Sequence, residues 1–207
     1  MTGLPAAKIF DALGEDYETA FAGLTVQREA VEWLAGQLPA GAKVVDLGCG
    51  TGRPAAELLA AAGHDVAGYD VSPRMIEIAR AQVPGARFEV GDLRSLSFPA
   101  GSLAAVVVCF SLLQLTRAEV DAALVRFAGW LAPGGFLLLG TIPGDVENLD
   151  IVFMGQPATV STYPVEIYRK RLTDAGLAVV WEKADTFVPD YPGGEPEEDL
   201  FITARKP

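Results

Sequence analysis

Short runs of β-branched and apolar residues alternate with longer helical stretches along most of the chain, from about residue 43 onward. This alternation is typical of an α/β fold with mainly parallel strands, because the chain must cross back over the sheet between two parallel strands. The expected strands cover residues 43–47, 65–69, 87–90, 104–110, 136–141, 178–183 and 200–204.

The stretches between these strands carry helix start and stop signals. Pro54 suits the first turn of one helix, and Ser72 followed by a proline has the pattern of an N-cap. Thr116 and Glu119 have the spacing of a capping box. These signals predict helices over residues 54–62, from residue 72, from residue 116 to just before Pro133, and over 164–175.

The two ends of the chain differ from its middle. Residues 17–38 have helical spacing and predict an N-terminal helical cap. No helix separates the last two expected strands, so the last one should run antiparallel to its neighbours. The expected architecture is a seven-stranded, mainly parallel sheet with an antiparallel last strand and helices on both faces. We expect one domain over residues 1–207, with a cap (1–40) and an α/β core (41–207).

The composition narrows the possible partners. Half of the 207 residues are hydrophobic and the formal net charge is −11, so we expect a globular protein that repels nucleic acid. Two cysteines and one histidine show no metal-ligand spacing, so no metal site is expected. The start of the chain lacks a signal-peptide pattern, and the apolar runs are shorter than a membrane helix requires. We therefore expect a cytoplasmic location and no membrane partner.

A glycine-rich loop follows the first expected strand. Gly48, Gly50 and Gly52 would leave bare backbone beside a ligand, and ligands of open parallel sheets lie at the carboxyl ends of the strands. A nicotinamide dinucleotide site normally has a third glycine where Arg53 stands here. Asp46, at the strand end, would repel a pyrophosphate but not a ligand with an ammonium and a sulfonium. The loop therefore favours a nucleoside with a cationic tail.

Two further aspartates stand where the second and third expected strands end. Asp70 follows the second strand, where a carboxylate can accept hydrogen bonds from both ribose hydroxyls. Asp92 follows the third, where it can accept from an adenine amino group while Leu93 packs on the ring. Each aspartate is weak evidence alone, since turns also use them. The ordered trio with Asp46 and the glycine loop is much more specific.

These segments resemble class I S-adenosylmethionine-dependent methyltransferases of the small-molecule type. The resemblance is carried by residues 45–52, 68–75 and 91–93, with 131–135 adding to it, and it extends over residues 17–207. It implies a Rossmann-like fold, S-adenosyl-L-methionine as the cofactor and S-adenosyl-L-homocysteine as the product. The implied reaction is an in-line displacement that transfers a methyl group to an O, N or C nucleophile of a small molecule.

The resemblance also implies roles for individual residues. Asp46 is expected to hold the amino group of the cofactor, directly or through water, and Asp70 its ribose. Tyr17 resembles an aromatic that reaches the cofactor carboxylate; its alternative role is to pack on the sheet edge. The other expected cofactor-lining residues are Gly48, Cys49 and Gly50 at the methionine part, Val71, Met75, Asp92 and Leu93 at the adenine, and Cys109 and Phe110 over the methionine part.

Residues that follow the fourth and fifth expected strands should face the acceptor. The segment 148–163 is expected to form a lid, and no general base stands out. His64 lies before the second strand, at the far end of the sheet, and Thr162 stands where many similar enzymes carry a histidine. The catalytic residues therefore stay unassigned. The candidates for the acceptor pocket, each of which could instead fill space above the sheet, are Phe110, Ser111, Gln114, Thr141, Met154 and Tyr163.

The acidic segment 185–199 contains no lysine or arginine and is expected to be a loop between the last two strands. Because the sixth strand should end at the active face, this loop should lie near the mouth of the site. Its charge would attract an amine or cationic acceptor. The simpler interpretation is a solvated surface loop. The sequence indicates neither the acceptor nor the oligomeric state.

Two alternatives to methyl transfer remain. A protein with this fold could bind S-adenosylmethionine and catalyse another reaction, or serve only in binding. An NAD(P)-dependent oxidoreductase is disfavoured by the glycine spacing and by Asp46. An acceptor that is a nucleic acid or a protein glutamine is disfavoured as well, because residues 109–112 lack the Asn-Pro-Pro-Tyr-like tetrad of that branch.

Overall fold

The expected strands and helices are present in the computed structural model, which describes residues 5–207. The helices are α1 (Pro5–Leu13), α2 (Glu15–Phe21), α3 (Thr25–Gln37), α4 (Ala55–Ala61), α5 (Pro73–Gln82), α6 (Arg117–Trp130) and α7 (Val165–Asp174). The strands are β1 (Lys43–Leu47), β2 (Asp65–Asp70), β3 (Arg87–Val90), β4 (Leu103–Cys109), β5 (Leu131–Thr141), β6 (Val146–Phe153), β7 (Gln156–Thr162), β8 (Ala178–Phe187) and β9 (Glu197–Arg205).

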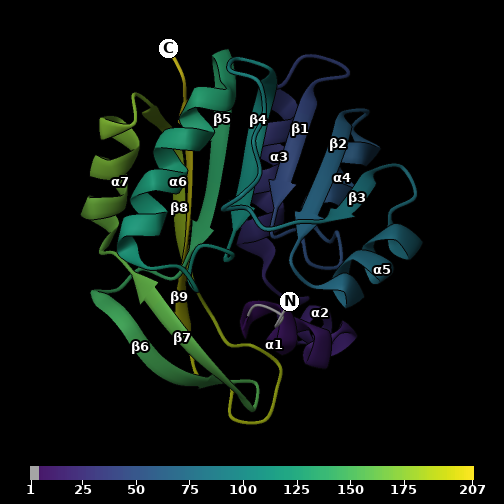
Figure 1. Ribbon diagram of the computed structural model, residues 1–207, viewed down its shortest axis with the longest axis vertical. Coiled ribbons are helices and arrows are strands. Elements are labelled where there is room, and N and C mark those ends of the chain that lie inside the picture. The colour runs from purple at the N-terminus through teal and green to yellow at the C-terminus, as the bar shows by residue number, and fades with distance from the viewer. Residues whose placement is uncertain (1–4) are drawn as a thin grey trace.

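Seven of these strands form one sheet in the order β3-β2-β1-β4-β5-β9-β8 (Figure 1). β1 pairs in parallel with β2 and β4, and β9 runs antiparallel between β5 and β8. The predicted mainly parallel sheet with an antiparallel last strand is therefore confirmed. The strand order reverses direction at β1, so the carboxyl ends of β1 and β4 border the crevice where such sheets bind ligands.

Helices cover both faces of the sheet, as expected. One face packs on α6 and α7 through buried residues such as Phe127 and Tyr168. The other packs on α3, α4 and α5 through Leu34, Leu59 and Ile76. Figure 1 shows α1, α2 and the β6–β7 hairpin gathered beyond the carboxyl ends of the parallel strands. The core thus anchors the sheet, and the remaining elements enclose one of its edges.

The helix starts that the sequence predicts are built as expected. Ser72 caps α5 by accepting a hydrogen bond from the backbone N–H of Met75 at 3.0 Å. Thr116 and Glu119 form both halves of the capping box at the start of α6. These caps satisfy backbone donors that a helix leaves free, and they stabilise each helix by about 1 kcal/mol.

The N-terminal region and the expected lid differ from the sequence prediction. The helical stretch 17–38 is interrupted near Gly23, where an added Cβ would lie 3.2 Å from the Phe187 ring, and α1 is a further helix that precedes this stretch within the expected cap. The lid is the β6–β7 hairpin. Its turn residues Met154 and Gly155 have φ values of 48° and 78°, as in a type I′ turn. Methionine is rare at such a position, so the sequence did not indicate this hairpin.

The acidic segment is shorter as a loop than predicted. β8 continues to Phe187 and β9 begins at Glu197, so only residues 188–196 connect them. Asp185 and Asp199 are paired across the two strands. The two strands are longer than predicted because they pair with each other. A strand rich in acidic residues is unfavourable alone and forms only beside its neighbours.

Candidate functional site

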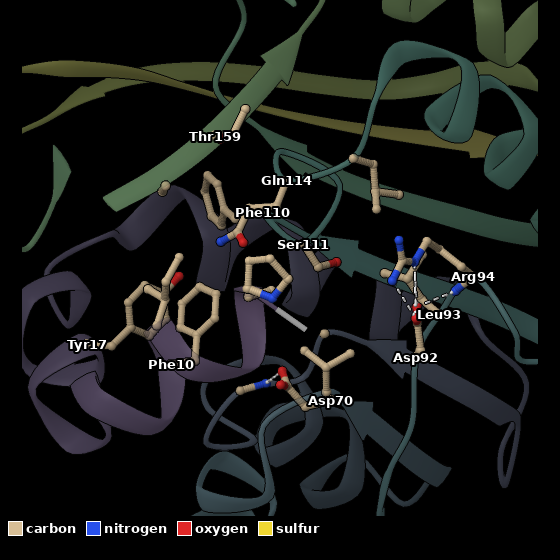
Figure 2. A pocket seen from close by; sticks show the side chains of 18 of the residues that line it. Phe10, Tyr17, Asp70, Asp92, Leu93, Arg94, Phe110, Ser111, Gln114 and Thr159 are labelled. Carbon is tan, nitrogen blue, oxygen red and sulfur yellow. Dashed lines mark hydrogen bonds and ion pairs between the residues drawn. The ribbon is translucent and has the colours of Figure 1, made fainter. Parts of the chain in front are cut away.

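A cavity of about 620 Å³ lies at the carboxyl edge of the sheet, enclosed by α1, α2 and the β6–β7 hairpin. A second cavity of about 180 Å³ borders it beside the glycine loop. Tyr17, Gly48, Gly50, Cys109 and Phe110 line both. In Figure 2 the rings of Phe10, Tyr17 and Phe110 lie on one side of the larger cavity, and Asp70, Asp92 and Arg94 lie on the other.

The glycine loop is held in place by hydrogen bonds from its backbone to β2. The N–H groups of Gly48 and Cys49 donate to the carbonyl of Tyr69 at 2.7 and 3.1 Å. Gly48, with a φ of 73°, packs so tightly on Ser111 that an added Cβ would lie 2.2 Å from the Ser111 Cβ. The Ser111 hydroxyl donates to the carbonyl of Leu47 at 2.7 Å. Gly50, in contrast, has open space on its Cβ side. The loop is therefore fixed on the side that packs against Tyr69 and Ser111, and Gly50 leaves open space on its other side.

Asp70 connects the second strand to this loop. Its Oδ2 accepts from the N–H of Gly50 at 3.0 Å, and its Oδ1 accepts from the N–H of Ser72 at 2.9 Å. Burial raises the pKa of Asp70, while these backbone hydrogen bonds oppose the rise. Because each carboxylate oxygen has a further lone pair, Asp70 can accept two more hydrogen bonds from a ligand.

Asp46 is a buried carboxylate at the end of β1, and it lines the smaller cavity. Its burial raises its pKa to about 7, and the nearby charge of Asp70 adds to the effect. A carboxylate in this position gains stabilisation from any cation that enters. Asp46 therefore gives the smaller cavity an acidic group that a positively charged ligand would stabilise in its ionised form.

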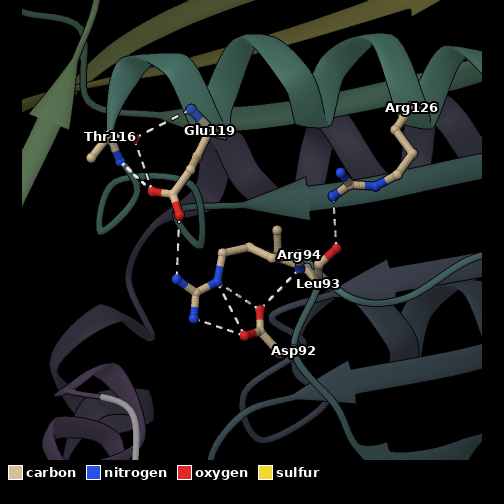
Figure 3. A network of polar contacts seen from close by, with 6 residues as sticks. All are labelled: Asp92, Leu93, Arg94, Thr116, Glu119 and Arg126. Atoms are coloured by element: carbon tan, nitrogen blue, oxygen red, sulfur yellow. Dashed lines mark hydrogen bonds and ion pairs between the residues drawn. The ribbon is translucent and has the colours of Figure 1, made fainter.

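Asp92 is tied to a cation of the chain itself, as Figure 3 shows. Its carboxylate accepts from the backbone N–H and from the guanidinium of Arg94 at 2.8–3.1 Å. Partial burial would raise the pKa of Asp92, but the hydrogen bonds from Arg94 outweigh it and lower the pKa. Arg94 also contacts Glu119, and Arg126 of α6 donates to the carbonyl of Leu93 at 2.9 Å. The turn after β3 is thus fixed onto α6.

Most of the predicted cofactor and acceptor residues come together at these cavities. Met75 does not line either: it is fully buried, and its backbone N–H donates to Ser72. The predicted residues that line the larger cavity are Tyr17, Gly48, Gly50, Asp70, Val71, Asp92, Leu93, Cys109, Phe110, Ser111 and Gln114, and those that line only the smaller one are Asp46 and Cys49.

Three acceptor candidates lie away from the cavity. Thr141 is buried and shares a hydrogen bond of 3.1 Å with the Tyr168 hydroxyl. Tyr163 is buried, and its hydroxyl donates to Asp121 at 3.0 Å. Met154 occupies the turn of the β6–β7 hairpin and packs with Ile9 and other residues of α1. Following a strand end is therefore not sufficient to face the cavity, since Thr141 and Tyr163 are directed by hydrogen bonds to Tyr168 and Asp121.

The sequence analysis missed several residues that line the cavities. Ile9 and Phe10 belong to α1, whose apolar spacing over residues 5–13 was the available signal. α1 is held down because Asp11 accepts from the Ser72 hydroxyl at 2.6 Å and from the Arg74 N–H at 3.2 Å. The other missed residues include Arg94, Asp150 and Thr159 at the larger cavity, and Gln27 and Arg28 at the smaller one.

Phe110 has a backbone conformation that non-glycine residues rarely adopt. Its φ is 60°, and its N–H donates to the carbonyl of Gly140 at 2.7 Å. Such a conformation costs about 1 kcal/mol or more and is found mainly where function requires it. It places the Phe110 ring against the cavity and against Phe201, with ring centroids 5.6 Å apart.

Comparisons with known proteins agree with this geometry. Residues 44–135 match the model of a methyltransferase domain family. A 27-O-demethylrifamycin SV methyltransferase of Amycolatopsis mediterranei is 34% identical over 159 residues, which are 70% of this chain and 57% of the relative. The chain spans about half the length of the curated relatives that it matches.

Two solved structures share the fold at lower identity. One is a Burkholderia thailandensis 1,6-didemethyltoxoflavin-N1-methyltransferase with bound S-adenosylhomocysteine; its TM-score is 0.71 at 21% identity, over 98% of this chain and 87% of that one. The other is the cyclase SpnF, with a TM-score of 0.74 at 18% identity, over 97% of this chain and 95% of that one. The glycine loop, the strand-end aspartates and the strand order agree with these likenesses. The chain belongs to the class I S-adenosylmethionine-dependent methyltransferase family.

Proposed function

We propose that this protein transfers a methyl group from S-adenosylmethionine to an O, N or C nucleophile of a small molecule. The observation that carries the proposal is the convergence of Asp46, Asp70 and Asp92 on one pair of connected cavities beside the glycine loop. Three strand ends that are far apart in the sequence thus meet at one site, where Asp46 and Asp70 would contact the cationic nucleoside and Asp92, already paired with Arg94, would border its adenine.

The residues present fit this cofactor. Asp46 would hold the ammonium group, and Asp70 would accept from the ribose hydroxyls. Gln27 and Arg28 offer donors for a carboxylate at the smaller cavity. Val71, Leu93 and Asp92 border the larger cavity where an adenine would lie. Gly50 leaves room for the cofactor to approach the backbone closely, since an added Cβ there would meet nothing within 4 Å.

The chain itself would mainly position the reactants and exclude water. When bound, the cofactor supplies a methyl group on a positively charged sulfur. Phe110, Ser111 and Gln114 follow β4 and line the larger cavity, where they would border the acceptor. The cover formed by α1, α2 and the β6–β7 hairpin would keep water away, which favours transfer between aligned groups. A general base is needed only for an acceptor that arrives protonated with a high pKa, such as an alcohol; a neutral amine or an ionised oxygen reacts without one.

A small acceptor suits the enclosure and the charge. The larger cavity has the size of a small-molecule site, and it is covered by three elements. The net charge of −11 disfavours a nucleic-acid acceptor. Among residues 5–207, no helix is long and apolar enough to cross a membrane. The enclosure and the negative charge support a small molecule over a polymer.

A second candidate function is a reaction other than methyl transfer in the same cavity. This candidate is considered because a solved structure with the same fold is a cyclase. Purified protein should be incubated with S-adenosylmethionine and a panel of small O, N and C nucleophiles, and S-adenosylhomocysteine should be measured. Methyl transfer predicts acceptor-dependent release. Cofactor binding without release from any acceptor would favour the second candidate, and binding of NADPH instead would contradict both.

Cofactor affinity should depend on pH through Asp46. Its pKa of about 7 in the free protein means that much of it is protonated below neutral pH, whereas an ammonium binds the ionised form. Affinity should therefore rise about tenfold as the pH rises from about 5.5 to about 7. Titration calorimetry across this range measures it. Asp46→Asn should bind weakly with a flatter profile; an unchanged profile in this variant would remove Asp46 from the ammonium site.

A further inference from the structure

Three carboxylates lie on one face of the β8–β9 hairpin without a basic partner among the described residues. Asp185 and Asp199 are directly paired across the strands, and Glu197 precedes Asp199 on the same face. Like charges in directly opposed positions destabilise a sheet. Asp199 is fully buried, and neither of its carboxylate oxygens has a hydrogen-bond partner within residues 5–207. A buried carboxylate without a partner is stabilised by a positive group, and residues 5–207 do not supply one.

The packing of neighbouring residues shows where these acids point. Phe201, two residues beyond Asp199 on the same face of β9, packs on the Phe110 ring. Phe187, paired with Glu197, packs on Phe21 of α2 at 6.1 Å between ring centroids. Glu197 and Asp199 also lie close enough to Tyr17 to raise the pKa of its hydroxyl, although burial is the larger cause. The two acids therefore lie near Tyr17, on the face of β9 from which Phe201 packs on Phe110, and neither acid lines the cavity.

Tyr17 and Phe110 face the cavity together with Phe10. All three rings line it, and Phe10 and Tyr17 pack edge to face with centroids 5.4 Å apart (Figure 2). The face of an aromatic ring attracts cations, and the attraction increases in a desolvated site. Nearby negative charges add to it across the low-dielectric interior. We define these three rings as the aromatic wall.

Among the described residues, no three acidic, histidine or cysteine side chains lie close enough to hold a metal ion. An organic cation is the group that both the rings and the acids would stabilise. We infer that the acceptor is an amine that reacts in its neutral form: its lone pair forms the N–C bond as the S–C bond of the cofactor breaks, and S-adenosylhomocysteine leaves as a neutral thioether. The positive charge that develops on the nitrogen lies against the aromatic wall, with Glu197 and Asp199 as the nearby counter-charges. This inference rests on the proposed methyl transfer and names its acceptor class.

The properties of Asp199 in the free protein agree with this role. Burial raises its pKa to about 7, and the charges of Glu197 and Asp185 add to the rise. A cation at the aromatic wall would lower that pKa and keep Asp199 ionised. The acids would act on the acceptor without lining the cavity, so they are positioning residues.

The test compares amines with neutral acceptors in matched variants. Wild type, Asp199→Asn and Glu197→Gln are assayed with S-adenosylmethionine and pairs such as 2-phenylethylamine and 2-phenylethanol. Glu198→Gln is the control, because Glu198 is exposed and points to the opposite face of β9. The ratio of kcat/KM for amine to that for alcohol is compared between variants, because the intrinsic difference in reactivity of the two acceptors cancels in that comparison. The ratio should fall at least about tenfold in Asp199→Asn, mainly through KM, and less than about twofold in the control.

Each outcome decides the inference. An unchanged ratio in Asp199→Asn and Glu197→Gln overturns it, and so does wild-type turnover of neutral acceptors with no amine. Weaker S-adenosylmethionine binding in Asp199→Asn, with the ratio unchanged, would assign the acids to the cofactor and also overturn it. Wild-type protein that binds no S-adenosylmethionine would instead refute the proposed function. Asp199→Asn should melt no lower than wild type, because it removes a buried unpaired charge.

Discussion

Asp70→Ala is expected to weaken S-adenosylmethionine binding at least about hundredfold. Two ribose hydroxyls would lose a charged acceptor, and each charge-assisted hydrogen bond contributes about 1.5–3 kcal/mol. The substitution also leaves the N–H groups of Gly50 and Ser72 without the carboxylate that they donate to at 3.0 and 2.9 Å. The loss therefore combines a missing ligand contact with a loosened glycine loop. Titration calorimetry on the purified variant measures it.

A graded control separates these two causes. Asp70→Asn keeps one carbonyl oxygen but replaces the other acceptor by a donor, so its affinity should lie between wild type and Asp70→Ala. Asp65→Ala removes an aspartate from the opposite end of β2, where it pairs with Arg87 at 2.7 Å, and should bind normally. Circular dichroism and thermal melting establish that each variant is folded. Normal affinity in a folded Asp70→Ala protein would exclude Asp70 from the ribose site.

Gly48→Ala is expected to lower the melting temperature by about 10 °C and to remove cofactor binding. The φ of 73° costs alanine about 1 kcal/mol, and the Cβ would lie 2.2 Å from the Ser111 Cβ. Relieving such an overlap in a packed site costs about 1–3 kcal/mol, and a domain of this size loses about 2–4 °C per kcal/mol. Differential scanning calorimetry and a cofactor titration measure the two effects.

The steric origin of this effect can be isolated. Gly63→Ala introduces the same kind of backbone strain at a φ of 85° but meets nothing within 4 Å, so it reports the conformational cost alone. Ser111→Gly removes the side chain that the new methyl group would strike. The double variant Gly48→Ala, Ser111→Gly should therefore regain part of the stability that Gly48→Ala loses. Purely additive losses would show that the overlap with Ser111 is not the cause.

The sequence predicted the features that depend on local order along the chain. Strand periodicity and the caps at Ser72 and Thr116 reflect neighbours within a few residues, so the sheet and its helices could be predicted. The glycine loop and Asp46, Asp70 and Asp92 could be placed together because parallel strands present their carboxyl ends at one edge. For the same reason the family resemblance was visible before any contact was known.

The sequence did not predict features that depend on contacts between distant segments. The β6–β7 hairpin has an unusual Met154 in its turn, and it packs on α1, which is distant in the sequence. Thr141 and Tyr163 were expected at the acceptor, but tertiary packing directs them to Tyr168 and Asp121.

By itself, therefore, the sequence determined the fold class, the cofactor family and the three strand-end carboxylates, since each follows from short-range pattern and strand direction. Only the tertiary structure decided which side chains enclose the cavity, and that Asp199 is buried with no hydrogen-bond partner among residues 5–207. The physical reason is that burial and charge pairing depend on what packs across the space between elements. Position along the chain does not specify those neighbours.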